Sequence, residues 1–300
     1  MEPQETLSLM HARKSYLRLG WSLVVLEVGA QIGAVLIALL GAVLASAGHD
    51  ISGTWWYFLL SNFLPIYLFG MPFALLILRR APAERPEPLL LSAKTFFQLL
   101  LICFPLLYIG SLIGNMVSNG LSGGLAENTL ELLAEQNAPL MTLSALLIAP
   151  LGEEFFFRRQ IIDRCSQYGE KTAILYSGLA FGLFHMNFYQ FFYAFALGLL
   201  LSYAYYRTGL LRTSVLLHML FNIIGSVVPM LLPDTIAAQS ALGLFWMAML
   251  VIGIILLVRG RKQQVWLHGP CAPSLKAVLQ NAGMFLLIVA CFVQTVFNYL

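Results

Sequence analysis

Charged side chains are scarce in this chain: Asp, Glu, Lys and Arg make up 10% of its 300 residues. An average soluble domain carries about 25%, and a chain with so few charges cannot cover a folded surface that faces water. The scarcity therefore excludes a soluble globular protein. Intrinsic disorder is excluded as well, because hydrophobic residues reach 59% and aromatic residues 13%, unlike the polar composition of disordered chains.

Cysteine is also sparse, and its spacing carries no pattern. None of the four cysteines belongs to a Cys-x-x-Cys pair, and three of them lie in or beside apolar stretches. Cysteine in such a setting behaves as a small hydrophobic residue. Neither a disulfide framework nor a cysteine-ligated metal is therefore expected. The His-Glu-x-x-His signature of a zinc-binding helix is missing too.

The abundant feature is the long apolar run. A bilayer core of about 30 Å needs about 20 apolar residues per helix. Thr172–Tyr206 runs for 35 residues without Asp, Glu, Lys or Arg; it is too long for one span and predicts a helical hairpin that turns near Asn187–Gln190. The other runs are Trp21–Ala47, Trp55–Leu78, Thr95–Val117, Pro139–Phe157, Thr213–Leu232, Ala237–Val258 and Ala277–Leu300. We expect an all-α, polytopic transmembrane helical bundle of about nine spans (eight to nine), forming a single integral membrane domain over residues 1–300.

The distribution of basic residues predicts the orientation. With nine spans, all 17 Lys and Arg fall on one side of the membrane, which the positive-inside rule assigns to the cytoplasm. The N-terminus is therefore expected to be cytoplasmic. We expect a multi-pass protein of a bacterial cytoplasmic membrane, with the lipid bilayer as a partner and no nucleic acid.

The first candidate site motif is Glu153-Glu154-x-x-x-Arg158. Charged groups inside a span cost about 2.5–3.5 kcal/mol each on insertion scales, so their presence needs a reason. Glu154 and Arg158 are four residues apart on one helix face, in the favourable acid-before-base order. Glu153 lies about 100° further round the helix and is free for another partner. The alternative is a charged helix end that faces the cytoplasm.

Two further motifs follow on later spans. Phe181-x-x-x-His185 lies in the hairpin, and His218-x-x-x-Asn222 lies in the next run. Each pair shares a helix face because its members are four apart. A buried hydrogen-bonded histidine and a polar contact between helices are the structural alternatives. Depths estimated from the helical rise scatter over roughly 8–20 Å from the cytoplasmic side, so the motifs meet only if helices tilt or water enters.

Together these motifs supply the groups needed to add water to a carbonyl. A glutamate can take a proton from water, a neutral imidazole can orient that water, and His218 and Asn222 can donate to the oxyanion. No serine or cysteine is similarly placed beside a base, so a covalent acyl-enzyme is not expected.

The ordered set of motifs resembles the intramembrane proteases of the CAAX-protease and bacteriocin-processing (CPBP) family, also called the Abi family. The resemblance covers about residues 139–232, the expected catalytic core. It implies an intramembrane endopeptidase (EC 3.4) that cleaves a membrane-associated peptide or protein near its membrane end. Glu153 would activate water together with His185, and His218 and Asn222 would form the oxyanion site. Glu154 and Arg158 would hold the geometry of the site.

The sequence is compatible with a metal-dependent and with a metal-independent mechanism. Family members are described both as metalloproteases and as metal-independent glutamate proteases, so the expected cofactor is none or a single zinc ion. Glu153, His185 and His218 are the ligands that would hold zinc, because nitrogen and oxygen donors suit it. Two other functions are also considered: a non-catalytic scaffold or bacteriocin-immunity-type protein on the same fold, and a transporter that uses the buried carboxylates.

Overall fold

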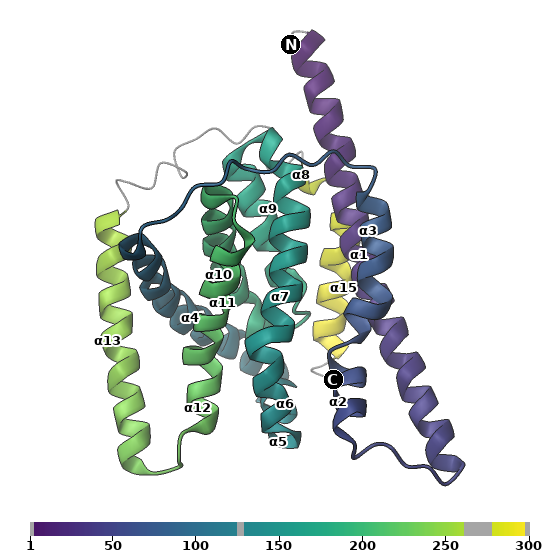
Figure 1. Cartoon of the computed structure of the whole chain (residues 1–300), viewed down its shortest axis with the longest axis vertical. Helices are drawn as coiled ribbons and strands as arrows, with labels where there is room; N and C mark the ends of the chain where they lie inside the picture. Colours follow the sequence, from purple (N-terminus) through teal and green to yellow (C-terminus); the bar gives the residue numbers. More distant parts are fainter. Residues whose placement is uncertain (1–2, 125–128, 261–277, 298–300) are drawn as a thin grey trace. The chain divides into compact units, whose positions relative to one another are not determined.

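The computed structural model describes residues 3–124, 129–260 and 278–297. Within these ranges the chain is helical and contains no strand (Figure 1), which confirms the all-α prediction. The chain divides into two compact units, one formed by residues 1–82 and 276–287 and the other by residues 83–275 and 288–300. Whether the two units act as the single membrane domain expected from the sequence stays a prediction.

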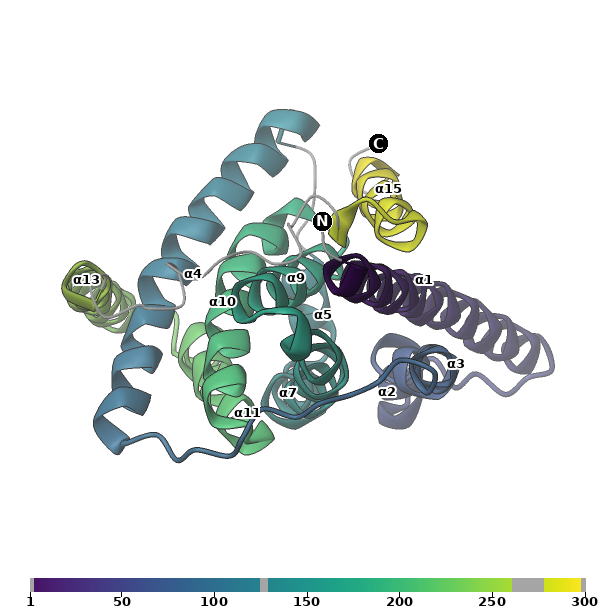
Figure 2. The ribbon, with the colours of Figure 1, turned by 90° about the horizontal axis from the view of Figure 1, so that it is seen from above.

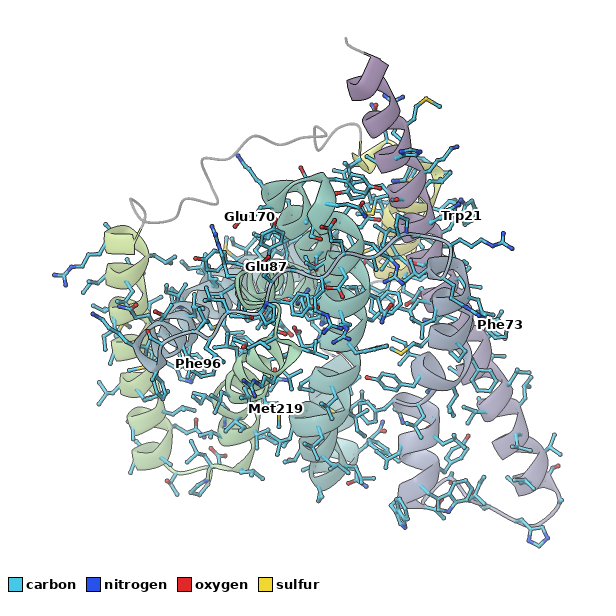
Figure 3. The ribbon with its side chains drawn as sticks, turned by 45° about the horizontal axis from the view of Figure 1, so that its top comes forward. Trp21, Phe73, Glu87, Phe96, Glu170 and Met219 are labelled. Carbon is cyan, nitrogen blue, oxygen red and sulfur yellow. The ribbon has the colours of Figure 1, made fainter. Side chains whose placement is uncertain are left out.

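The first unit is built on one long helix and a bent helical pair. Helix α1 packs against the π-helical turn η1 and against α3. It buries Leu19, Leu23 and Leu26 completely, and their spacing of four and three residues places them on one face. Trp21 and Phe73 instead point outward (Figure 3), as expected where the surroundings are lipid rather than water. The elements are α1 (Pro3–Ser46), α2 (Trp55–Asn62), η1 (Ile66–Gly70) and α3 (Met71–Leu78).

The second unit holds the three motifs. Its elements are α4 (Ala93–Ser122), α5 (Thr129–Gln136), α6 (Ala138–Leu143), η2 (Ser144–Ile148), α7 (Ala149–Glu154), η3 (Phe155–Ile162), α8 (Asp163–Cys165), η4 (Ser166–Tyr168), α9 (Glu170–Leu183), α10 (Phe188–Thr208), α11 (Leu211–Asn222), η5 (Ile223–Val227), α12 (Val228–Leu231) and α13 (Ile236–Gly260). The last described helix, α15 (Ala282–Phe297), contributes residues to both units.

Helix α10 lies at the centre of the second unit. Seen from above, α13, α4, α10 and α9 lie side by side in that order (Figure 2), and neighbours in this row contact each other. Helices α9 and α10 approach closely because two glycines face each other: a Cβ on Gly198 would lie 3.1 Å from Gly178 Cα. Helix α11 contacts both α10 and α7. This packing brings α7, α9 and α11, which carry the motifs, around one point.

By length and composition, fewer helices qualify as membrane spans than the nine that the sequence predicts. Six helices among the described residues are long and apolar enough to cross a membrane, or seven if the pair bent by 50° between Trp55 and Leu78 is one span. Helix α9, with 14 residues, and α15, with 16, are shorter than a full span. The count of nine and the cytoplasmic N-terminus stay predictions.

The predicted hairpin within 172–206 is confirmed, because α9 ends at Leu183 and α10 begins at Phe188. The turn comes a few residues earlier than expected. Asn187 is the N-cap of α10: its Oδ1 accepts a hydrogen bond from the Gln190 backbone N–H at 2.9 Å. Gln190 therefore already belongs to the first turn of the helix rather than to the connection.

Prolines coincide with π-helical turns in three of the apolar helices. The turns η1, η2 and η5 are each followed, two residues after their last residue, by Pro72, Pro150 and Pro229. Proline has no N–H, and its ring clashes with the carbonyl one turn earlier in a regular α-helix. A locally wider turn relieves that clash without ending the helix. Two of the three turns, η2 and η5, contact each other beside the candidate site.

Candidate active site

The centre of the site is a completely buried ion pair. Arg158 Nε donates to Glu154 Oε2 at 3.0 Å and Nη2 donates to Glu154 Oε1 at 3.4 Å, and both side chains are 0% exposed. The two residues meet because they are four apart on the continuous helix formed by α7 and η3. Removing both charges from solvent is costly, so the pair is stable only if its remaining hydrogen-bonding groups are also satisfied.

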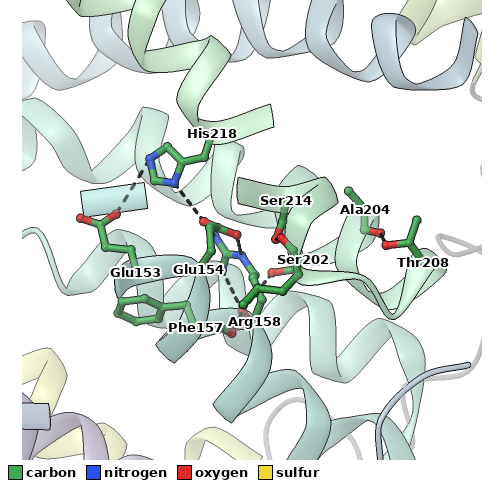
Figure 4. A network of polar contacts seen from close by, with 11 residues as sticks. Glu153, Glu154, Phe157, Arg158, Ser202, Ala204, Thr208, Ser214 and His218 are labelled. Carbon is green, nitrogen blue, oxygen red and sulfur yellow. Dashed lines mark hydrogen bonds and ion pairs between the residues drawn. The ribbon is translucent and has the colours of Figure 1, made fainter. Parts of the chain in front are cut away.

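The Glu154 carboxylate also accepts a hydrogen bond from His218, which lies on helix α11. Its Nδ1 lies 3.0 Å from Glu154 Oε1 (Figure 4). A carboxylate paired with a guanidinium only accepts hydrogen bonds, so Nδ1 carries the proton in this contact. The other ring nitrogen, Nε2, is thereby directed away from Glu154. Ser214, one turn before His218 on α11, donates to the Leu211 carbonyl oxygen at 3.1 Å.

Glu153 faces that second nitrogen of the same imidazole. Its Oε2 lies 3.9 Å from His218 Nε2 (Figure 4), which is longer than a hydrogen bond. Its side chain is 24% exposed, whereas that of Glu154 is 0% exposed. The two adjacent glutamates therefore differ as expected from their angular separation on the helix. Glu154 accepts hydrogen bonds from Arg158 and His218, and Glu153 is available to another group.

An aromatic ring joins the histidines to the ion pair. The Phe181 ring lies edge-on to His185 at 5.0 Å and to His218 at 5.9 Å between ring centroids. The Arg158 guanidinium carbon lies 4.8 Å from the centre of the same ring. His185 Nδ1 is 2.8 Å from the Phe181 carbonyl oxygen. Since a carbonyl only accepts, His185 donates from Nδ1 and keeps a free lone pair on Nε2.

Asn222 makes a contact that the sequence did not predict. Its Nδ2 donates to the Ala145 carbonyl oxygen at 2.9 Å, which ties the end of α11 to η2. The residue that would donate to this carbonyl along a π-helical ladder is Pro150, which has no N–H. Asn222 thus supplies a bond that the helix cannot make for itself, and one N–H of its amide remains for another acceptor.

One comparison with known proteins found a match in the part of the chain that holds the site. Residues 135–224 match the model of the Rce1-like family, described as type II CAAX prenyl endopeptidase Rce1-like. This segment is therefore similar to the Rce1-like family, and it is called the Rce1-like segment below. The match spans all three motifs and confirms the resemblance predicted from them. No curated protein and no solved structure matches the chain.

The Rce1-like segment offers no ready metal centre among the residues that the structure describes. Within them no group of three or more His, Cys, Asp or Glu side chains could hold a metal ion. His218 donates from Nδ1 to Glu154 and His185 donates from Nδ1 to the Phe181 carbonyl, so each ring keeps its Nε2 for another partner. Metal dependence stays a prediction, and no reaction step is assigned to zinc.

Two serines of the Rce1-like segment escaped the sequence analysis. Ser177 Oγ accepts from Arg158 Nη1 at 3.0 Å, and Ser202 Oγ donates to Ser177 Oγ at 2.9 Å. A signal for Ser177 was present, because Ser177, Phe181 and His185 follow one another at intervals of four on one face of α9 and its C-terminal turn. Nothing in the sequence pointed to Ser202, which comes from α10 and depends on how the two helices pack.

Proposed function

We propose that the chain is an intramembrane endopeptidase that hydrolyses a peptide bond near the membrane end of a membrane-bound protein or peptide. The observation that supports this most is that two carboxylates face the two nitrogens of one imidazole. Glu154 lies 3.0 Å from Nδ1 of His218, and Glu153 lies 3.9 Å from Nε2. One carboxylate is fixed by Arg158, and the other is free to accept a proton. Such a division of roles is typical of acid–base sites with paired carboxylates.

Glu153 is the general base in this proposal. It takes a proton from water, the resulting hydroxide adds to the substrate carbonyl carbon, and a tetrahedral oxyanion forms. The protonated Glu153 then gives its proton to the nitrogen of the leaving amine as the C–N bond breaks. His185 orients the water. Its Nε2 lone pair can accept a hydrogen bond from the second O–H of the water, while Nδ1 donates to the Phe181 carbonyl.

His218 and Asn222 stabilise the oxyanion. In this scheme the His218 ring carries both protons, so that Nε2 donates to the oxyanion while Nδ1 donates to Glu154. Asn222 contributes the N–H that its bond to Ala145 leaves free. Glu154 and Arg158 do not contact substrate in this scheme; they hold His218 in place.

The bilayer and a membrane-associated substrate are the partners that this function requires. The Rce1-like match and the long apolar helices support an integral membrane location. We keep two expectations from the sequence as part of the proposal: that the membrane is a bacterial cytoplasmic membrane, and that nucleic acid is not a partner. The cofactor is proposed to be none, with one zinc ion as the alternative that a chelator tests.

The test is cleavage of a quenched peptide library by the purified chain in detergent, with and without a metal chelator. Wild type is compared with Glu153→Gln, His218→Ala and Glu87→Gln, a control that removes an exposed carboxylate outside the site. We expect kcat to fall at least about 100-fold for the first two variants and to stay unchanged for Glu87→Gln. Chelator should have no effect; inhibition by chelator that zinc reverses would establish the metalloprotease instead.

Other outcomes separate the remaining functions. Cleavage that persists in Glu153→Gln overturns the role of this residue as the base. A well-folded wild type that cleaves nothing but captures a membrane peptide equally well as Glu153→Gln supports a scaffold or immunity-type protein. Ion-coupled flux in vesicles that Glu153→Gln alters supports a transporter.

A further inference from the structure

A short chain of hydrogen bonds supports the ion pair on the side away from His218. Arg158 Nη1 lies 3.0 Å from Ser177 Oγ, which lies 2.8 Å from the Phe157 carbonyl oxygen and 2.9 Å from Ser202 Oγ. Arg158, Ser177 and Ser202 are all 0% exposed. Figure 4 labels Phe157, Arg158 and Ser202 of this chain, beside Glu154 and His218 of the site.

The chemistry of these groups fixes the direction of every bond. A guanidinium only donates and a carbonyl only accepts, whereas a hydroxyl has one proton and two lone pairs. Ser177 must therefore accept from Arg158 and give its single proton to the Phe157 carbonyl. Its second lone pair is left for Ser202, which must be a donor. Ser177 thus uses its full hydrogen-bonding capacity: it accepts from Arg158 and Ser202 and donates to the Phe157 carbonyl.

The consequence reaches the proposed catalytic groups through Arg158. Its Nη1 is held by Ser177 while Nε and Nη2 are held by Glu154, so the planar guanidinium is bonded along two edges. A guanidinium held in this way presents a fixed target to Glu154, and Glu154 in turn holds His218 Nδ1. Without Ser177 the guanidinium keeps only its bonds to Glu154, so its orientation, and through Glu154 that of His218, is less constrained.

We propose that Ser177 is a positioning residue for the hydrolysis, acting on His218 through Arg158 and Glu154, with Ser202 as the donor that completes its bonding. This inference rests on the proposed function for its kinetic test, but the orientation of His218 can be measured without cleavage. Ser177 does not touch the substrate in this scheme. The expected effect is on the chemical step rather than on binding.

The main variant is Ser177→Ala, and the matched control is Ser22→Ala. Ser22 is also 0% exposed, but its hydroxyl donates to the Leu19 carbonyl oxygen of its own helix at 2.8 Å. We expect Ser177→Ala to lower kcat roughly 10- to 100-fold, the usual effect of a small misplacement at a reacting centre, with KM within about twofold of wild type and a shifted pH profile of kcat. Ser22→Ala should change none of these.

Two more variants should lower kcat by smaller amounts than Ser177→Ala. Ser202→Ala removes one donor but leaves the bonds of Ser177 to Arg158 and Phe157, so kcat should fall less than about threefold. Ser177→Cys keeps a side chain of similar size with a weak donor and weak acceptor, and it serves if the alanine variant does not fold. Its kcat should lie between those of wild type and Ser177→Ala.

The second measurement is the pH titration of the His218 ring by nitrogen NMR, assigned by comparison with His218→Ala. We expect Ser177→Ala or Ser177→Cys to shift the His218 titration while Ser22→Ala leaves it unchanged. Unchanged kcat together with an unchanged His218 titration in a folded Ser177 variant overturns the positioning role. A shifted titration in a chain whose wild type cleaves no peptide upholds the positioning role and counts against the proposed function alone.

Discussion

Removing the carboxyl group of Glu154 should destabilise the protein far more than neutralising its neighbour Glu153. Glu154→Ala leaves the guanidinium of Arg158 completely buried with only the Ser177 hydroxyl as a polar partner, and it deprives His218 Nδ1 of its acceptor. Breaking a buried ion pair from one side costs about 3–5 kcal/mol. Glu153→Gln should change the unfolding free energy by less than about 1 kcal/mol, because Glu153 is partly exposed and has no hydrogen bond to His218.

A double-mutant cycle tests whether the loss of unfolding free energy comes from breaking the Glu154–Arg158 ion pair. Arg158→Met removes the charge but keeps much of the volume, so it should also be costly alone, since Glu154 is then buried without its counter-ion. The double variant Glu154→Ala/Arg158→Met leaves no unpaired charge. It should therefore be less destabilised than the sum of the single variants, with a coupling energy of about 2–3 kcal/mol.

The assay is equilibrium unfolding in mixed micelles, followed by a thiol-reactive dye. The three cysteines in the described part of the chain carry buried thiol groups, so they react only on unfolding; they are Cys103, Cys165 and Cys291. Cys271 lies outside the described residues and is replaced by serine in every variant. Equal destabilisation by Glu153→Gln and Glu154→Ala, or a coupling energy near zero, would refute the division of roles between the two glutamates.

Three further outcomes follow from the packing around the site. Asn222→Ala should lower the unfolding free energy by about 1–3 kcal/mol by leaving a carbonyl unpaired, and adding Pro150→Ala, which restores a backbone donor, should recover part of it in the same assay. Gly209→Ala should cost more than Gly48→Ala: both have positive φ, +59° and +88°, but only at Gly209 would a Cβ meet neighbouring backbone. Tyr205→Phe should cost about 1.5–3 kcal/mol in thermal unfolding, because it removes a buried 2.6 Å hydrogen bond to a carboxylate.

The parts of the site that the sequence predicted are those fixed by the geometry of one helix. Glu154 and Arg158 pair because residues four apart lie near the same helix face, and they remain close enough to pair across the π-helical turn that begins at Phe155. The same spacing places Phe181 beside His185. The helical hairpin was predictable from length alone, since a run of 35 uncharged residues exceeds one span. Such inferences need no knowledge of how helices pack.

The parts that the sequence missed depend on contacts between helices. Ser202 reaches Ser177 only because α10 packs against α9 in one register, with Gly178 and Gly198 in close approach. The scatter in depth between the motifs also came from treating each span as a regular, straight helix. The structure replaces part of that regularity with π-helical turns, such as η3 directly after Glu154, and those change both the rise and the angular position of the residues that follow.

Proline offers a route by which some of these contacts become predictable. A proline inside an apolar helix leaves one carbonyl of the preceding turn without its donor, and in a membrane no water in the hydrocarbon core can replace that donor. A side chain on a neighbouring helix is then the available source, as Asn222 is for Ala145, one turn before Pro150. The same contact fixes the position of α11 relative to η2, and His218 lies one turn earlier on α11. The proline in the glutamate helix thus helps to set where the imidazole of the next motif meets Glu153 and Glu154.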